Sequence, residues 1–380
     1  MRKIRDTPYY SKLVGRLPEG CRLCVRGAKL VLFVTGLCPG RCFYCPLSER
    51  RRWKDVTVAN EWWIRRPKDI VEEARLCDAE GAGLTGGDPL MRLDRTVKYI
   101  RLLKNSFGGD FHTHLYTSGA LATDKTLRRL YRAGLDEIRF HPEKKDWGKI
   151  ALALKYDWSV GCEIPAIPDE EEKAVEFVDY VSGLGVSFMN INEMEVSETN
   201  YHALSKLGLQ ISNDDSSAIA GSDVVAGRLL EYCARENDLS VHYCTVKLKD
   251  RVQVGRRIIR RARNVKKPFD IVDGEGILLR GAIYFPGLEP SFGYNRKLES
   301  LPVKERANTT SRLRRLRDSL QVEYGIPQNL IEVDGKRLRV LTASWVLEEI
   351  SGDLKERGLK VALVWEYPTW DAFITELDFL

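Results

Sequence analysis

The sequence has no long apolar segment and lacks the features of a secreted protein. None of its 380 residues lies in a run of 18 apolar residues, which excludes a membrane-spanning helix of ordinary length. The first residues, MRKIRDTPYY, lack the apolar core of a secretion signal. Five of the nine cysteines lie within positions 21–45, unlike the framework of a disulfide-rich domain. We therefore expect a cytoplasmic protein in a reducing compartment, with no membrane partner.

Three cysteines are closely spaced after a predicted strand. Cys38, Cys42 and Cys45 follow the apolar run 30–35 with the spacing C-x3-C-x2-C, so we expect them on a loop at the end of that strand. Three thiolates are one ligand fewer than an iron–sulfur cube needs, which leaves one iron open to a second molecule. A zinc site is the alternative, because Cys21 and Cys24 could complete a set of four ligands from upstream.

A glycine-rich turn follows about forty residues later. Residues 82–90 read AGLTGGDPL, a short apolar strand that ends in Gly86, Gly87, Asp88 and Pro89. The two glycines let the backbone approach a ligand closely, and the proline fixes the turn. Such a segment alone is typical of a plain strand-to-helix turn. After this cysteine loop, ligand binding is the favoured interpretation.

Together the two segments resemble the signature of the radical S-adenosylmethionine (SAM) superfamily. Tyr44 precedes the last cysteine as in the family, and Asp88 stands where the family more often has glutamate. The resemblance covers about residues 30–200. It is greatest to an archaeal branch related to the activating enzymes of glycyl-radical proteins such as pyruvate formate-lyase.

The resemblance implies the cofactors and the reaction. A [4Fe-4S] cluster would be held by Cys38, Cys42 and Cys45, with SAM on the open iron. Reductive cleavage of SAM would give a 5′-deoxyadenosyl radical that abstracts hydrogen from a substrate which the sequence does not identify. A ferredoxin- or flavodoxin-like protein would be the one-electron donor. The cofactor carries the chemistry, and the protein supplies orientation and excludes water.

Strand-like and helix-like segments alternate through the first half of the chain. β-rich runs are expected at 30–35, 82–86, 112–117, 137–141, 160–167 and 187–196, with helices at 69–78, 92–106, 124–133, 145–155 and 169–183. This alternation predicts a parallel sheet with right-handed crossovers. The fold class is therefore α/β, and the six units match the partial (β/α)6 TIM-like barrel that the resemblance implies. In a barrel the chemistry lies at the carboxyl ends of the strands.

The chain divides into three predicted parts. Residues 1–29 form an N-terminal extension with the CxxC pair Cys21 and Cys24, and residues 30–245 form the barrel. The pair is a candidate for an auxiliary metal site or a redox function, against plain or structural thiols. Residues 246–380 contain a basic helix and a smaller α+β domain that we expect to bind substrate or a partner. In it, Asp334-Gly335 predicts a hairpin between strands at 329–333 and 337–342.

The strand ends supply further candidate residues, although none is assigned as a catalytic group. By the resemblance, the residues expected to contact SAM are Tyr44, Gly86, Gly87, Asp88, Pro89, Thr117, Ser118, His141 and Glu163. His141 departs from the small hydroxyl residue of the family. Strand alternation turns it and Arg139 into the barrel, or makes them a structural pair with nearby carboxylates. Buried polarity near 187–196 and 241–244 indicates possible substrate contacts at Asn192, Glu193, His242 and Cys244.

The stretch 241–267 is strongly basic. Its ten Lys and Arg stand against only two acidic residues up to position 270, Asp250 and Asp270. Such a run can neutralise phosphates, so RNA or another anionic substrate is a candidate partner. A solvated helix paired with acidic neighbours is the plainer alternative. A tRNA- or nucleic-acid-modifying enzyme and a glycyl-radical-type protein-activating enzyme therefore remain alternatives to an enzyme acting on a small molecule.

Overall fold

The computed structural model describes residues 1–213 and 216–380 and divides into two compact units, Met1–Arg257 and Ile258–Leu380. Seven neighbouring parallel strands form the centre of the first unit. In their order along the sheet they are β13 (Ser240–Cys244), β10 (Phe188–Asn192), β9 (Ser159–Pro165), β8 (Glu137–Phe140), β7 (His112–Thr117), β6 (Gly81–Gly86) and β3 (Lys29–Thr35). The six predicted strands are confirmed, and β13 adds a seventh to the partial barrel.

Short antiparallel strands extend both edges of this sheet. On the β3 side lie β4 (Val58–Ala59) and β5 (Trp62–Trp63), and on the β13 side lie β2 (Lys12–Val14) and β1 (Ile4–Asp6). The strand order thus runs from β1 to β5 without closing on itself within the described ranges. A separate hairpin pairs β11 (Ile211–Asn213) with β12 (Ser216–Ile219).

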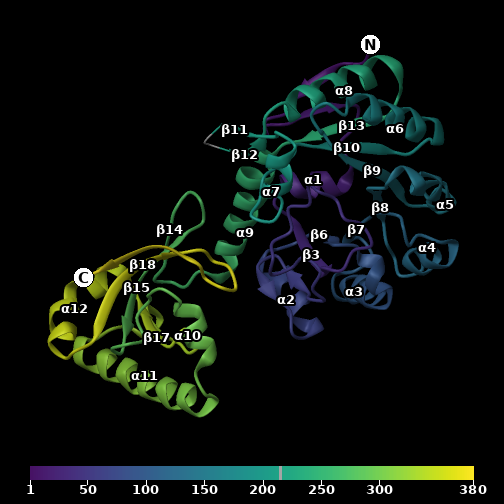
Figure 1. Cartoon of the computed structure of the whole chain (residues 1–380). Coiled ribbons are helices and arrows are strands. Elements are labelled where there is room, and N and C mark those ends of the chain that lie inside the picture. The colour runs from purple at the N-terminus through teal and green to yellow at the C-terminus, as the bar shows by residue number, and fades with distance from the viewer. Residues whose placement is uncertain (214–215) are drawn as a thin grey trace. The chain divides into compact units, whose positions relative to one another are not determined.

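Helices connect the parallel strands and surround them in Figure 1. They are α2 (Pro67–Leu76), α3 (Leu93–Phe107), α4 (Asp124–Tyr131), α5 (Ile150–Ala153), α6 (Glu171–Leu184) and α8 (Ser222–Glu236), with the short α7 (Tyr201–Lys206) after β10. The Thr123 hydroxyl accepts a bond from the Thr126 amide and caps α4, where the sequence predicts a helix start. Leu30, Leu32 and Val34 of β3 are fully buried in the main core, as the alternation of a strand between helices and barrel interior requires.

The N-terminal helix α1 (Glu19–Val25) closes the amino-terminal end of the barrel. A side chain at Gly20 would lie within 2.9 Å of His114 and Glu137, so the helix backbone rests directly on the first residues of the strands. The Leu23 side chain lies against Gly81, the first residue of β6. In consequence α1 turns Cys21 and Cys24, which are buried, toward the barrel interior.

The second unit contains an antiparallel sheet in the order β16 (Ile331–Asp334), β17 (Arg339–Thr342), β15 (Leu278–Tyr284), β18 (Lys360–Glu366) and β19 (Ile374–Phe379), with β14 (Ile271–Val272) beside β15. Its helices are α10 (Tyr294–Ser300), α11 (Val303–Tyr324) and α12 (Ser344–Glu356), and the short 3-10 turn η4 (Gln328–Leu330) precedes β16. The predicted hairpin at Asp334-Gly335 joins β16 to β17. The helix α9 (Gly255–Val265) links the units along the chain. No helix in the described residues has the length and apolarity needed to cross a membrane.

Candidate active site

A cavity of about 510 Å³ runs through the barrel of the first unit. Its mouth is formed by the loop that follows β3 and by the glycine turn that follows β6, with Cys38, Cys42, Cys45, Gly86 and Gly87 among the lining residues. Its floor is formed by α1 and the inward faces of the strands, with Cys21, Cys24, Lys29, Tyr116 and Arg139. One chamber therefore joins the two sequence segments that carry the motifs to a polar interior.

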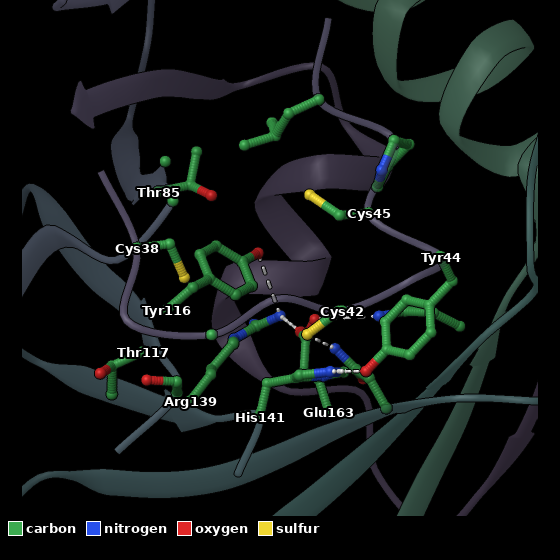
Figure 2. Close-up of a pocket in the computed structure, with 18 of the residues that line it drawn as sticks. Cys38, Cys42, Tyr44, Cys45, Thr85, Tyr116, Thr117, Arg139, His141 and Glu163 are labelled. Carbon is green, nitrogen blue, oxygen red and sulfur yellow. Dashed lines mark hydrogen bonds and ion pairs between the residues drawn. The ribbon is translucent and has the colours of Figure 1, made fainter. Parts of the chain in front are cut away.

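The three cysteines of the mouth face a common space. Figure 2 shows the side chains of Cys38, Cys42 and Cys45 turned toward the cavity from different sides of their loop. A side chain at Gly40 would lie 3.8 Å from the Cys38 sulfur and 3.9 Å from the Cys42 sulfur, so these two thiols converge on one side of the loop. All three thiols are free and partly exposed. Burial raises the pKa of Cys38 to about 11 and also raises that of Cys42, so these thiols would have to give up their protons in order to hold a metal.

The glycine turn packs directly against the start of the cysteine loop. The Gly87 amide donates to the Thr35 carbonyl at 2.8 Å, and the Asp88 amide donates to the Leu37 carbonyl at 2.8 Å. A side chain at either Gly86 or Gly87 would clash with carbonyl oxygens of the loop. The two motifs therefore form one structure, and the glycines leave their backbone open to a ligand beside the thiols.

Asp88 organises the turn from beneath. Its carboxylate is fully buried and accepts bonds from the Thr117 hydroxyl, the Leu90 amide, and both the amide and the hydroxyl of Ser118. Burial raises its pKa, although these donors act in the opposite direction. Asp88 and Pro89 are not among the residues that line the cavity, whereas Thr117 and Ser118 are. The carboxylate thus fixes the end of β7 against the end of β6.

Two comparisons with known proteins bear on this arrangement. Residues 32–144 match the radical SAM superfamily. The chain is also 44% identical over 289 residues to a Methanocaldococcus jannaschii protein that has the provisional name glycyl-radical enzyme activating enzyme MJ0021, and the match covers 73% of this chain and 76% of that protein. The chain belongs to the radical SAM superfamily. Its cofactors are accordingly a [4Fe-4S] cluster and SAM, and it is a radical SAM enzyme.

The remaining matches concern the fold and the C-terminal unit. Residues 276–377 match a domain of unknown function, DUF8061. SAM-bound SuiB of Streptococcus suis aligns with a TM-score of 0.41 and 13% identity over 57% of this chain and 50% of that one. The radical SAM enzyme HemN of Escherichia coli, a coproporphyrinogen III oxidase, aligns with a TM-score of 0.36 and 11% identity over 58% and 56%. The match thus spans about half the length of each of these two solved enzymes.

The donor set of the mouth fits the cluster of the radical SAM family. The three free thiols of the motif lie on one loop and face one cavity, and the glycine backbone beside them is uncovered. Within residues 1–213 and 216–380, no group of three or more His, Cys, Asp or Glu side chains is arranged to hold a metal ion. An iron–sulfur cube does not need such a single-ion site, because each of its three cysteine ligands binds a different iron.

Tyr44 and His141 connect the cysteine loop to β8. The Tyr44 hydroxyl lies 2.6 Å from Nε2 of His141, and the two rings meet edge to face. Both residues line the cavity, and Figure 2 shows them side by side. Burial lowers the pKa of His141, with the Glu163 charge and backbone acting in the opposite direction. The imidazole is therefore neutral near pH 7, and its bond to Tyr44 holds the loop in place.

A charged cluster occupies the interior below the mouth. Arg139 is 1% exposed, and its guanidinium bonds to Glu137 at 2.5 Å and to Glu163 at 2.8 Å. It lies between the rings of Tyr116 and Phe188, with centroids at 5.3 and 5.1 Å. Burial would raise the pKa of Glu163, but the Arg139 charge and three hydrogen bonds hold that pKa below its usual value. Strand alternation correctly predicts that Arg139 faces the barrel interior. Arg139 also pairs with nearby carboxylates, which was the alternative interpretation of this residue.

The candidate substrate residues separate into two groups. Asn192 and Cys244 line the cavity, and the Asn192 amide donates to Glu163 at 3.1 Å. Glu193 instead accepts bonds from the Tyr243 hydroxyl and the Val246 amide, and His242 lies 3.2 Å from the Ser11 hydroxyl. Neither Glu193 nor His242 is among the cavity-lining residues. Their roles, and those of the predicted SAM contacts, stay predictions.

Several lining residues were not predicted as site residues. Lys29 and Tyr116 occupy inward positions of β3 and β7, and Lys249 and Gln253 come from the π-helical segment η3 (Leu248–Val254). Alternation along KLVLFVT could have indicated Lys29, because it shares a face with Val31 and Phe33 rather than with the buried Leu30 and Leu32. No local pattern identifies Lys249, which the sequence shows only as one member of a basic run.

Proposed function

We propose that this radical SAM enzyme abstracts hydrogen from a molecule bound in the interior of its barrel. The observation that carries the proposal is the single cavity that joins the cysteine loop to a polar floor. When bound, the cluster and SAM supply a 5′-deoxyadenosyl radical. The residues of the chain hold these groups, orient the substrate and keep water from the radical.

Each group at the mouth has a proposed part in this arrangement. Cys38, Cys42 and Cys45 hold the cluster and leave one iron for SAM. The backbone at Gly86 and Gly87, the hydroxyls that Asp88 positions, and the Tyr44–His141 pair shape the SAM site, with Pro89 fixing the turn and Glu163 below. Helix α1 excludes water from the opposite end, where Cys21 and Cys24 are available for a redox or auxiliary metal role.

A protein substrate is the second candidate. It is favoured by the name of the M. jannaschii relative, which describes an activating enzyme of a glycyl-radical enzyme. In that case a glycine-containing loop of the partner would enter the cavity, and the product would be a stable organic radical on the partner. An electron paramagnetic resonance signal that appears on the partner only with SAM and reductant present would favour this candidate over a small molecule.

A nucleic-acid substrate is less well supported by the contacts of the basic run. At least five of its ten cations are engaged within the described residues. They are Lys249 with Glu195, Arg256 with the Val25 carbonyl, Arg257 with Asn60 and Glu61, Arg261 with the Pro368 carbonyl, and Lys267 with Glu332. These side chains are less available to phosphates. We propose that 246–380 binds substrate or a partner, that a ferredoxin- or flavodoxin-like protein supplies electrons, and that the enzyme works in the cytoplasm, where its free cysteines stay reduced.

The test is the release of 5′-deoxyadenosine by anaerobically reconstituted enzyme with dithionite and SAM. We expect release by the wild-type enzyme and a loss of at least about a hundredfold in Cys42→Ala, because the cluster loses one of its three ligands. Cys233→Ala is the matched control, since Cys233 is buried in α8 and is not a cavity-lining residue. Release by Cys42→Ala at the wild-type rate would refute the proposal.

A further inference from the structure

Lys29 places an ammonium group on the cavity floor. It is the first residue of β3, and its side chain is half-buried and lines the cavity. Its Nζ lies 3.3 Å from the Tyr116 hydroxyl and 5.7 Å from the centre of the Tyr116 ring. The Cys24 thiol lines the same cavity, close enough to affect the pKa of Lys29. The amine thus faces the chamber between a phenol and a thiol.

Lys29 differs from the other cations of the cavity interior in having no carboxylate partner. Two further cations line this interior, the buried Arg139 and the half-buried Lys249. Both are ion-paired, Arg139 with Glu137 and Glu163 and Lys249 with Glu195. Across the residues that the structure describes, no carboxylate oxygen comes within 4.0 Å of Lys29 Nζ. An ammonium removed from bulk water without a counter-charge is costly, so its retention here needs an explanation.

The surroundings hold this side chain in place. Gly83 of the neighbouring strand β6 leaves room for it, because a side chain there would lie 3.3 Å from Lys29 Cδ and 2.7 Å from His114 Nε2. The methylene stem of Lys29 packs against the strand, and its amine is directed to the chamber. A lysine amine has an ordinary pKa of about 10.4, so it carries a positive charge near neutral pH.

We propose that the floor is an oxyanion-binding subsite in which Lys29, assisted by the Tyr116 hydroxyl, binds a carboxylate or phosphate group of the substrate. The proposal rests on the function proposed above and adds the chemical class of the molecule. An anion supplies the missing counter-charge and forms charge-assisted hydrogen bonds in a partly dehydrated site. The rest of the substrate then extends from Lys29 toward the mouth, where hydrogen is abstracted.

Equilibrium dialysis of radiolabelled inorganic phosphate, and separately of radiolabelled acetate, tests the subsite. The cluster-loaded enzyme is used with SAM present, without reductant and at constant ionic strength, so that the SAM site is already filled. We expect the wild-type enzyme and Lys68→Met, an exposed residue of α2, to bind at least one of the two anions. Lys29→Met should lower that affinity by roughly tenfold or more, as expected for losing one charged hydrogen-bond donor.

Two further variants keep the result interpretable. Lys29→Arg keeps the charge and should retain most of the binding, and Tyr116→Phe should weaken it less than Lys29→Met does. The anion bound more tightly by the wild-type enzyme distinguishes a phosphate from a carboxylate substrate. Equal binding by Lys29→Met, or no binding of either anion by the wild-type enzyme, would overturn the subsite.

The outcome is separable from the function proposed above. An enzyme that releases 5′-deoxyadenosine but binds anions independently of Lys29 contradicts only the subsite. An enzyme that binds anions through Lys29 but never cleaves SAM contradicts the proposed reaction instead.

Discussion

Each unit of the chain buries an arginine between two carboxylates, and the two clusters differ in what lies beside them. In the first unit, Arg139 bonds to Glu137 and Glu163 and lines the cavity. In the second unit, Arg339 is fully buried and bonds to Glu366 at 2.8 Å and to Asp334 at 3.1 Å. Arg339 is not a lining residue of that cavity.

The difference separates two uses of a buried ion pair. Desolvation makes such pairs weak contributors to stability, although breaking one is costly. In the second unit the cluster joins strands β16, β17 and β18 around a closed core, so its consequence is structural. In the first unit the Arg139 cluster holds polar groups in place next to an open chamber. A core of apolar side chains would have filled this space.

The largest expected effect comes from removing Arg139. Arg139→Met leaves the buried Glu137 and Glu163 without an arginine partner, which should cost about 3–5 kcal/mol of stability in the first unit. Arg339→Met should cost less in the second unit, because Glu366 keeps Arg280 and Asp334 keeps Arg337. Hydrogen exchange read by mass spectrometry should show faster exchange in 112–192 for the first variant and in 278–366 for the second.

The same variants differ in activity. Arg339→Met should retain 5′-deoxyadenosine release within about twofold, because Arg339 and its partners belong to the second unit and do not line the cavity. A loss of release in Arg339→Met equal to that in Arg139→Met would remove the distinction between the two clusters.

A smaller effect concerns His242, whose pKa is lowered both by burial and by the charge of Arg139. These two causes lower the pKa of His242 to about 4. The unfolded chain, with a histidine pKa of about 6.5, binds a proton that the folded chain does not. The contribution of His242 to stability is therefore constant above pH 6.5. It falls by about 3 kcal/mol as the pH decreases toward 4.

Denaturant unfolding at a series of pH values measures this contribution. His242→Gln should lose less stability than the wild-type chain between pH 6.5 and 4. Parallel pH profiles for the two proteins would show that the histidine is not held neutral by its site.

The smallest expected effect concerns the packing around Arg139. Gly161 leaves space for the Phe188 ring, which stacks on the Arg139 guanidinium, and a side chain at Gly161 would overlap that ring. Gly161→Ala should therefore cost about 1–3 kcal/mol. Gly281→Ala in the second unit should cost at least as much, because its added carbon would lie 2.8 Å from Leu347 Cβ and 3.1 Å from the Ala343 carbonyl oxygen, and neither atom can move without the backbone. Thermal unfolding of both variants compares the costs, and a clearly smaller cost at Gly281 would contradict this packing argument.

The mouth of the cavity could be predicted from sequence because its chemistry is local. Cys38, Cys42 and Cys45 lie on one loop, and the Gly86–Pro89 turn follows the next parallel strand, so adjacency in the sheet brings them together. The six strands and the hairpin at Asp334-Gly335 were predicted for the same reason, from period and turn residues within each segment.

The floor could not be predicted, because it depends on contacts between distant segments. The position of α1 under the strands is set by packing of Gly20 and Leu23, and no periodicity in seven residues specifies it. From the sequence, Lys249 is expected to lie on a solvated basic helix. In the structure the π-helical segment places it in the cavity lining, paired with Glu195. Polar residues at inward strand positions acquire a role only when the barrel interior is assembled.

The electron paramagnetic resonance spectrum of the reduced, cluster-loaded enzyme, recorded before and after SAM is added, tests the central claim most directly. Three cysteine ligands leave one iron for SAM, so the spectrum should change when SAM binds. A spectrum that SAM leaves unchanged, from a centre with four protein ligands, would contradict the account.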